Sequence, residues 1–380
     1  MRTKTIFSRI ISATLLFACV LFAINTSLAQ EENARPESSV QTSQSEFVSV
    51  ATGGPQLVNL MVQPSVNRVY TPPLIDYSRA PQGSMINVNF NPSSCASATL
   101  AAVEPWPSQA RTSFLQAISI YEALFTSSVT IEVDACWRPL GPGVLGSAGS
   151  LNSFTDGQFV YPVSLANALS GQDLDPGISD IITNFSSEFN WYFGLDGNTP
   201  PTQLDFVSVI LHELAHGFGF SGSMQVGQIG GTGPVVGLWG GGGGIPASYD
   251  QFVENGANQS IINTSIFPNP SVALRDQVTS NNLFFDGPQT RIANGGQRAP
   301  LYAPSNWSQG SSYSHLAESF NDTENALMTF ALESGEARHS PGPVGLGVFH
   351  DVGWGRIAPL VGCGITVNCP IKSFLPIAIR

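Results

Sequence analysis

The residues with the clearest chemistry are His212-Glu213-Leu214-Ala215-His216, in an apolar segment that starts at Phe206. On a helix, residues four apart project from one face, with Cβ atoms about 5–6 Å apart. Two imidazoles at that spacing can reach one tetrahedral Zn²⁺ at about 2.0–2.1 Å. Glu213 then lies beside the metal, where it can take a proton from an activated water and pass it to a leaving amine. The pattern predicts a zinc site with a general base.

The same five residues could instead be packed or solvated histidines without a metal, because so short a pattern also arises by chance. The chain has only 27 acidic, 15 basic and 5 histidine residues among 380. A His-Glu-His cluster next to the apolar run from Val207 to Leu211 would be a costly way to fill a core. Composition therefore favours metal binding.

A catalytic zinc site needs a third protein ligand, since such sites have three ligands and one open position. The remaining histidines are His315, His339 and His350. His315 lies in a polar loop ahead of Met328, His339 in a charged loop between prolines, and His350 in an amphipathic run where a packed or surface histidine is ordinary. We expect His315 to be the third ligand. Some zinc hydrolases use a downstream glutamate instead, and Glu254 is the candidate for that alternative.

The N-terminus predicts export. Three basic residues precede an apolar stretch from Ile10 to Ile24, and Ser27-Leu28-Ala29 offers the small residues that a signal peptidase reads. The apolar stretch is short for a membrane span, and no later segment reaches about 18 uninterrupted apolar residues. We therefore expect a signal peptide at residues 1–29 and a protein that is secreted, extracellular or at the cell surface, with no stable membrane span.

The charge balance argues against nucleic-acid binding. Without residues 1–29, which contain three basic and no acidic residues, the chain has 12 basic and 27 acidic residues and a net charge of −15. Phosphate backbones repel such a protein.

Four cysteines remain after signal removal: Cys95, Cys136, Cys363 and Cys369. An even number in an exported chain predicts two disulfides, and proximity along the chain favours Cys95–Cys136 and Cys363–Cys369 among the three connectivities. Four buried thiols are the alternative.

The chain divides by composition into three parts after the signal. Residues 30–80 are rich in Ser, Gln, Glu, Pro and Thr and predict a flexible leader or propeptide. Ordered structure is expected from Met85, within a domain that spans residues 81–358. Residues 359–380 form a tail that contains the small Cys363–Cys369 loop.

Strands and helices alternate within the domain. Apolar alternation predicts strands at 85–90, 129–133, 143–148 and 179–185, and helical spacing predicts helices that open at Pro107-Ser108, at Ser164, at Phe206 and at Val344. A glycine-rich stretch with Gly240 to Gly244 follows the His212 helix and predicts a surface loop. The order indicates an α/β (α+β) domain with a twisted mixed sheet packed on helices.

These residues resemble the metzincin zinc metallopeptidases over roughly residues 85–356. The segment from His212 to Gly219 is similar to their active-site helix, and Ala326-Leu327-Met328 is similar to their Met-turn, whose methionine lies beneath the metal. Residues 143–148 resemble their edge strand, which pairs with the substrate backbone, and residues 346–354 resemble the helix that closes the domain.

The chain departs from most metzincins after the helix. Their third histidine comes three residues after the helix glycine, and Gly222 occupies that position here. The position of His315, far from the helix and ahead of Met328, resembles the leishmanolysin-like arrangement, in which a long segment separates the helix from the last histidine. The rest of the domain resembles a matrixin-like core. The position of His315 implies that residues 223–314 are a long insertion. Because Ser147 and its neighbours include no histidine, we expect no second, structural zinc.

The resemblance implies a secreted zinc-dependent endopeptidase. One catalytic Zn²⁺ would be bound by His212, His216 and His315, with Glu213 as general base and acid. An extended polypeptide substrate would pair with Val144, Leu145, Gly146, Ser147 and Ala148 by strand addition. We expect a monomer.

Two alternatives stay open. The chain could be a non-catalytic exported surface or adhesion protein whose metal site is vestigial. The turns at Asp173–Gly177 and Asp196–Asn198 could also bind Ca²⁺, although neither has the spacing of a defined calcium loop and such turns are usually only turns.

Overall fold

The computed structural model describes residues 47–50, 56–66, 68–77, 83–229, 233–240 and 244–355. All of them belong to one of two compact units, Phe47–Arg380. The predicted signal peptide, the first part of the predicted leader and the tail with Cys363 and Cys369 lie outside the described residues. No helix within the described ranges is both long enough and apolar enough to cross a membrane.

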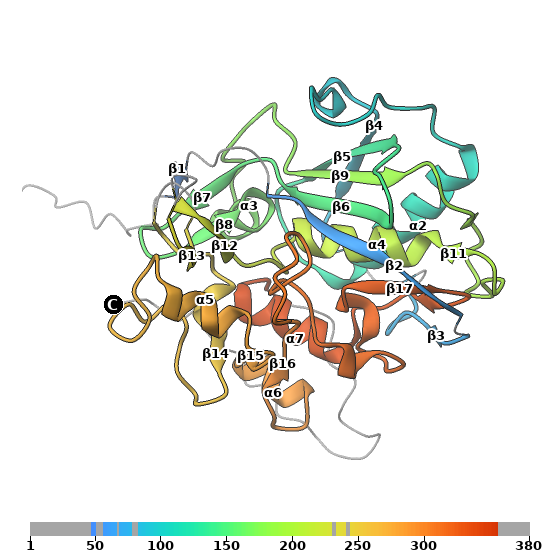
Figure 1. Cartoon of the computed structure of the whole chain (residues 1–380). Helices are drawn as coiled ribbons and strands as arrows, with labels where there is room; N and C mark the ends of the chain where they lie inside the picture. Colours follow the sequence, from blue (N-terminus) through green and yellow to red (C-terminus); the bar gives the residue numbers. More distant parts are fainter. Residues whose placement is uncertain are drawn as a thin grey trace, which may run out of the picture. The chain divides into compact units, whose positions relative to one another are not determined.

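A six-stranded mixed sheet organises the fold (Figure 1). Its order is β17 (Ala331–Ser334), β2 (Val58–Val66), β6 (Val144–Ser150), β9 (Ile181–Ser186), β5 (Ile131–Arg138) and β4 (Ile86–Phe90). Strands β4, β5 and β9 run parallel to one another, β6 runs antiparallel to both of its neighbours, and β17 runs parallel to β2.

Six α-helices accompany the sheet in the described residues. They are α2 (Ser108–Leu124), α3 (Val163–Ser170), α4 (Phe206–Gly217), α5 (Val272–Val278), α6 (Pro288–Ala293) and α7 (Gly342–Val352). The predicted helices at Pro107-Ser108, Ser164, Phe206 and Val344 are confirmed within a few residues by α2, α3, α4 and α7. The mixture of sheets and helices is compatible with the predicted α+β class.

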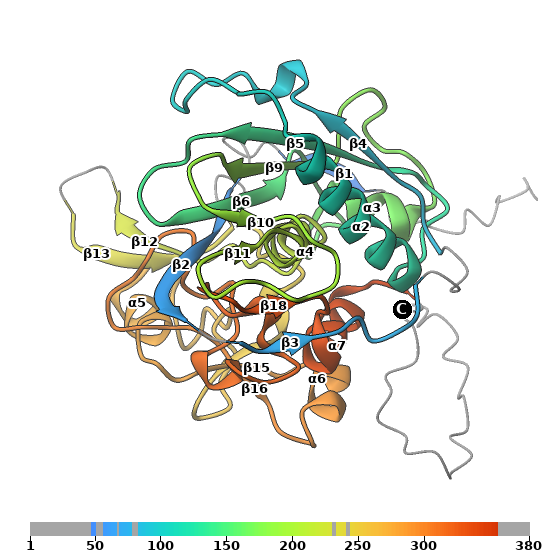
Figure 2. The same cartoon turned by 90° about the vertical axis from the view of Figure 1, so that its right-hand side faces the viewer.

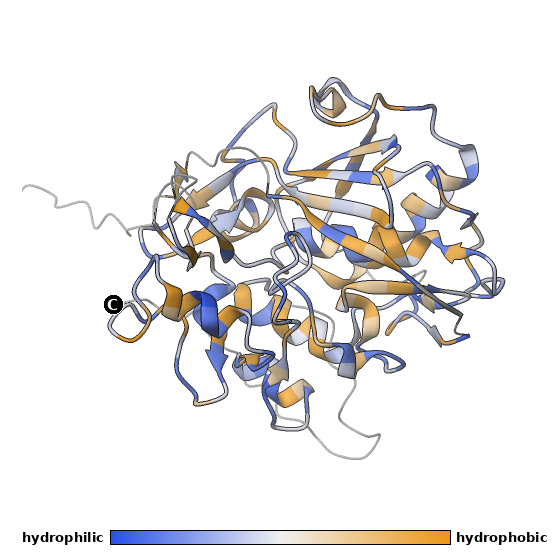
Figure 3. Cartoon of the chain, in the orientation of Figure 1, coloured by the Kyte–Doolittle hydropathy of each residue, from blue (hydrophilic) through white to orange (hydrophobic). Residues whose placement is uncertain are grey.

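The main apolar core lies where α2 and α4 pack against the sheet. Figure 2 shows α4 end-on, with β5, β6 and β9 on one side and β3 and β18 on the other. Phe114 from α2, Phe185 from β9 and Phe206 from α4 are fully buried, with Phe114–Phe185 and Phe185–Phe206 ring centroids 5.6 and 5.4 Å apart. Such edge-to-face pairs stabilise a core beyond simple area burial. Hydrophobic residues recur along the strands and α4 (Figure 3).

Several small sheets and 3₁₀ turns complete the fold. The sheets contain β1 (Val48–Val50), β7 (Ser153–Thr155) and β8 (Val160–Pro162); β3 (Tyr70–Thr71) and β18 (Ala337–Arg338); β10 (Trp191–Tyr192) and β11 (Leu204–Asp205); β12 (Gln225–Gln228) and β13 (Val235–Leu238); and β14 (Val253–Asn255), β15 (Leu283–Phe285) and β16 (Ala299–Pro300). The 3₁₀ turns are η1 (Ser93–Cys95), η3 (Asp250–Phe252), η4 (Glu318–Phe320) and η5 (Ala326–Met328).

Residues 223–314 are more ordered than the sequence predicted. They form β12 to β16, α5 and α6, and they bury side chains such as Leu274, Leu283 and Phe285. The sequence did not predict these elements, because the apolar residues of the strands are distributed over segments of two to four residues, too short to show periodicity.

Ordered structure also begins earlier than predicted. The expectation of a flexible leader up to residue 80, with order from Met85, is wrong for β2, which pairs with β6 on one side and β17 on the other. The same pairing makes β6 an internal strand. The prediction that residues 144–148 form an edge strand is therefore also wrong, because β2 occupies the side expected to be free.

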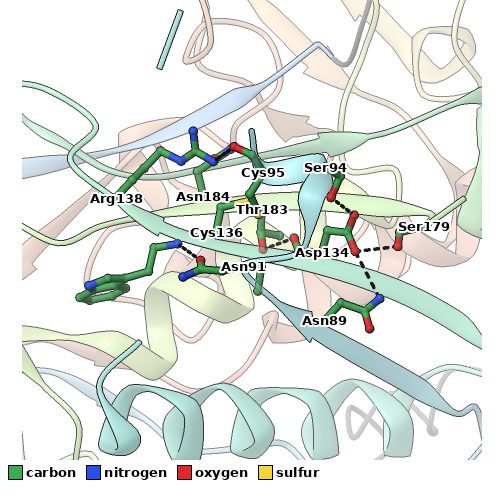
Figure 4. The surroundings of a disulfide bond; sticks show 12 residues. Asn89, Asn91, Ser94, Cys95, Asp134, Cys136, Arg138, Ser179, Thr183 and Asn184 are labelled. Carbon is green, nitrogen blue, oxygen red and sulfur yellow. Dashed lines mark hydrogen bonds between the residues drawn. A yellow bond between two sulfur atoms is a disulfide. The ribbon is translucent and has the colours of Figure 1, made fainter. Parts of the chain in front are cut away.

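The predicted disulfide between Cys95 and Cys136 is present (Figure 4). It ties η1 to β5, and both half-cystines are buried. Next to it, the carboxylate of Asp134 accepts hydrogen bonds from Asn89 and Ser179, the latter at 2.7 Å. The predicted Cys363–Cys369 disulfide lies outside the described residues.

Replacing both Cys95 and Cys136 by Ser should lower the free energy of unfolding by about 3–4 kcal/mol. The bond closes a loop with a sequence separation of 41 residues, which restricts the unfolded chain. Denaturant unfolding of both proteins, with and without reductant, measures the effect. Reductant should remove the difference in stability between the two proteins. Equal stability of the oxidised parent and the variant would contradict the prediction.

Candidate metal centre

The candidate site is built on α4, whose residues are all buried. Asp205 caps its N-terminus: the carboxylate accepts hydrogen bonds from the Ser208 N–H at 2.8 Å and the Ser208 hydroxyl at 2.6 Å. The helix ends at Gly217, and the chain turns away through Gly219 at φ +105°. Glycine adopts that φ without strain.

The structure brings His212, His216 and His315 together. The Nε2 atoms of His212 and His216 are 3.0 Å apart, those of His212 and His315 3.1 Å, and those of His216 and His315 3.3 Å. Three nitrogens bound tetrahedrally at about 2.0–2.1 Å from zinc would be about 3.3 Å from one another. The three side chains therefore have the spacing of a tetrahedral metal site.

A backbone carbonyl fixes the orientation of each imidazole. Nδ1 of His212 lies 2.7 Å from the Leu327 carbonyl oxygen, Nδ1 of His216 2.8 Å from that of Phe220, and Nδ1 of His315 2.6 Å from that of Ser311. A carbonyl only accepts, so each Nδ1 is the donor and each neutral ring keeps its lone pair on Nε2. Three lone pairs directed at one point repel one another unless a cation lies between them. This donor set fits a zinc ion.

Burial keeps these rings neutral. It is the main cause that lowers the pKa of His212 and of His216 well below the usual value, and the neighbouring imidazoles lower both further. Burial also lowers the pKa of His315 to about 4, against a smaller opposite effect of its bond to Ser311. Neutral imidazole is the form that binds metals.

Glu213 follows His212 in α4 and is fully buried. One carboxylate oxygen, Oε1, accepts a hydrogen bond from the Leu60 N–H at 3.2 Å, whereas Oε2 has no hydrogen-bond partner. Burial raises the pKa of Glu213 well above the usual value. Gly146 of β6 is needed here, because a Cβ at that position would come within 2.8 Å of Glu213. A buried carboxyl with one unpaired oxygen suits a proton-transfer group.

The η5 turn, which contains Met328, supports two of the three histidines. The carbonyl of Leu327 orients His212, and the Met328 carbonyl accepts a hydrogen bond from the Leu316 N–H at 2.8 Å, directly after His315. Met328 is fully buried. The segment resembling a Met-turn thus lies beside the histidine cluster.

Arg338 fixes the η5 turn to the rest of the domain. Its guanidinium donates to the carbonyls of Ala326 and Ala331 at 2.8 and 3.1 Å and pairs with Glu336. This role was not predicted, because the charged residues near His339 are typical of a solvated loop. The sequence did contain a signal for a buried ion pair: Glu336 and Arg338 are opposite charges that stand between an apolar segment and prolines.

The other two candidate histidines do not join the cluster. His339 is buried, and its Nε2 lies 2.8 Å from Asp205 Oδ1, so it supports the cap of α4. His350 is exposed in the last turn of α7. An Asp immediately before a helix is a common N-cap and could have identified Asp205 from the sequence.

The alternative oxygen ligands also lie elsewhere. Glu254 is in β14 and forms an ion pair with Arg298 at 3.4 Å, so it is not the third ligand. In the predicted calcium turns, Asp175 accepts a hydrogen bond from Asn152, and Asp196 accepts from Tyr192 at 2.6 Å. Across the described residues, His212, His216 and His315 are the group of three that could bind a metal.

Gly222, where most metzincins have their third histidine, has no room for a side chain. A Cβ there would meet Tyr313 Cε1 at 2.0 Å and the Asp250 carboxylate at 2.5 Å. Tyr313 itself donates to Asp250 at 2.9 Å, two residues before His315. Tyr313, in the segment that carries His315, therefore occupies the space that a side chain at position 222 would need.

Gly222→Ala should lower the free energy of unfolding by about 1–3 kcal/mol or more, because the added methyl overlaps Tyr313 in a packed interior. Gly227→Ala is the control, since a Cβ at Gly227 meets nothing within 4 Å. Thermal or denaturant unfolding of both variants measures the difference. Equal stability of the two variants would contradict this view of the packing.

Comparisons with known proteins add one partial match. A family model described as SPBPB7E8-like matches residues 160–231, which include α4 and its two histidines. No curated protein and no solved structure matches the chain.

Proposed function

We propose that the protein is an exported zinc-dependent endopeptidase of the metzincin type. The observation that carries this proposal is the convergence of three neutral, buried imidazoles, two of them from the helix that also carries Glu213, whose Oε2 is buried and unpaired. The resemblance of α4 to the metzincin helix, the nearby Met328 turn and the distant His315 support it. The lack of space at Gly222 explains why the third ligand comes from far along the chain.

Zinc, when bound by His212, His216 and His315, would polarise the scissile carbonyl and lower the pKa of a water to about 7. Ionised Glu213 would take one proton from a water through Oε2 while the water oxygen bonds to the scissile carbonyl carbon, and it would deliver that proton to the amide nitrogen as the C–N bond breaks. The orienting carbonyls of Leu327, Phe220 and Ser311 keep the three rings in the required tautomer during this transfer.

The buried position of the site contributes to this chemistry. His212, Glu213 and His216 are at most 2% exposed, so the proton moves in a region that excludes bulk water. Electrostatic interactions are stronger there than in solution. We further propose a polypeptide substrate, a monomeric enzyme and a location outside the cell.

The test combines metal analysis with product analysis on the purified full-length chain. We expect one zinc per chain, hydrolysis of a denatured protein, loss of both with a chelator and return of both with Zn²⁺. Long incubation and mass spectrometry of the products detect slow turnover. Stoichiometric zinc without new peptide products would instead favour a non-catalytic surface protein.

A further inference from the structure

Strand β2 occupies the position in which a bound substrate would be expected if the chain is the proposed peptidase. Strands β6 and β17 lie on either side of it, and the blue β2 separates the green β6 from the red β17 in Figure 1. The backbone of a peptide bound by strand addition would make the same pairings. A role for β2 at the active site therefore rests on the proposed peptidase function.

The backbone of β2 pairs with β6 on one side and with β17 on the other. It runs antiparallel to β6, with Asn59 opposite Ser147 and Leu60 opposite Gly146. Beyond the bulge, the Met61 N–H donates to the Phe330 carbonyl at 3.0 Å, on the side of β17. The first part of β2, Val58 to Met61, thus pairs with β6, and the part from Met61 to Val66 pairs with β17.

One peptide bond of β2 lies at the catalytic carboxylate. The Leu60 N–H donates to Glu213 Oε1 at 3.2 Å. In the proposed reaction the amide nitrogen next to Glu213 is the one that leaves with a proton. The bond from Asn59 to Leu60 therefore has the position of a scissile bond, with Leu60 on the amine side.

The side chains of β2 also alternate as those of a bound peptide would. Val58 and Leu60 are 6% and 2% exposed, whereas Asn59 and Met61 are partly exposed. Leu60 belongs to the main apolar cluster of the domain. The residue on the amine side of the candidate scissile bond is thus an aliphatic side chain packed among apolar residues.

We propose that β2 is an intramolecular inhibitor bound in the manner of a substrate. While β2 is in place, it covers the metal site and the peptidase turns over only slowly. When β2 is displaced, a polypeptide substrate binds in its place, antiparallel to β6 as β2 is. Its residue on the amine side of the cleaved bond is aliphatic and of the size of leucine. The competing view is that β2 is a permanent structural strand.

Leu60→Asp and Leu60→Ala test this proposal on the full-length chain. Both remove the apolar anchor of β2, so we expect hydrolysis of a denatured protein and removal of zinc by a chelator to become at least about tenfold faster. Leu283→Ala is the control, because Leu283 is equally buried, at 1% exposure, but lies in β15. It should accelerate neither process, although it lowers stability. If Leu60→Asp does not fold, the milder Leu60→Ala still gives both rates.

The outcomes separate the two proposals. Slower hydrolysis and unchanged zinc removal in the Leu60 variants, as in Leu283→Ala, would overturn the inhibitory role and leave the peptidase intact. If zinc removal is faster in the Leu60 variants but neither they nor the parent hydrolyse protein, β2 does cover the metal site and the proposed peptidase activity is overturned. The products of the released enzyme should begin with Leu, Ile or Met, and cleavage without that preference would overturn the proposed register of Leu60.

Discussion

Glu213→Gln should keep one zinc per chain and lower the rate of peptide hydrolysis by about 10²–10⁴-fold. The amide has the shape of the carboxyl and still accepts from the Leu60 N–H, but it cannot carry a proton from water to the leaving nitrogen. Rates on a denatured protein, measured at equal zinc content, give the ratio.

Glu254→Gln provides the matched control for this experiment. It makes the same chemical change at a partly exposed residue that pairs with Arg298, outside the histidine cluster. Its hydrolysis rate should equal that of the parent. Glu213→Gln with parental activity would show that the carboxyl of Glu213 is not the proton carrier.

His315→Ala should lower the affinity for zinc by more than about 100-fold. It removes one of three ligands, whereas loss of groups that only orient ligands already costs about 10–100-fold. The two remaining imidazoles cannot complete a tetrahedral site. Zinc content after dialysis against a weak chelator measures the loss, and hydrolysis should fall with it.

His339→Ala and His350→Ala serve as controls with opposite environments. His339→Ala should retain zinc but lower the free energy of unfolding by about 1–3 kcal/mol, because it leaves the buried Asp205 with an unmade hydrogen bond. His350→Ala changes an exposed residue and should alter neither property. Loss of zinc from His339→Ala together with its retention in His315→Ala would overturn the assignment of ligands.

The helix that carries His212 and His216 was predictable because its information is local. The pair His212 and His216 needs only a helix to share a face, and the apolar residues from Phe206 onward predict that helix. The alternation in 85–90 and 179–185 likewise predicted β4 and β9. In these segments local pattern and tertiary environment agree.

His315 was reached by choosing among three histidines, and the structure does place it with the other two. The sequence alone could not give its geometry. That geometry depends on the Ser311 carbonyl, on the Met328 turn and on Tyr313 and Asp250, which are held together by tertiary contacts. Such contacts leave no periodic pattern to read.

The main error was β2. Its sequence, Val58 to Val66, contains a polar Asn, a Gln and a Pro, and its apolar residues were diluted in a window of about fifty largely polar residues. Strand β2 is specified by its partners β6 and β17 rather than by its own alternation. The same dependence on partners concealed β12 to β16, which are too short to show a period.

The most direct test of the central claim is digestion of a denatured protein in ¹⁸O-water by the zinc-loaded chain, followed by mass spectrometry of the fragments. Hydrolysis places one oxygen of water on each new carboxyl end and a proton on each new amino end. We expect labelled fragments from the parent and almost none from Glu213→Gln at equal zinc content. No new ends from the parent, or equal labelling by both proteins, would contradict a zinc peptidase that uses Glu213.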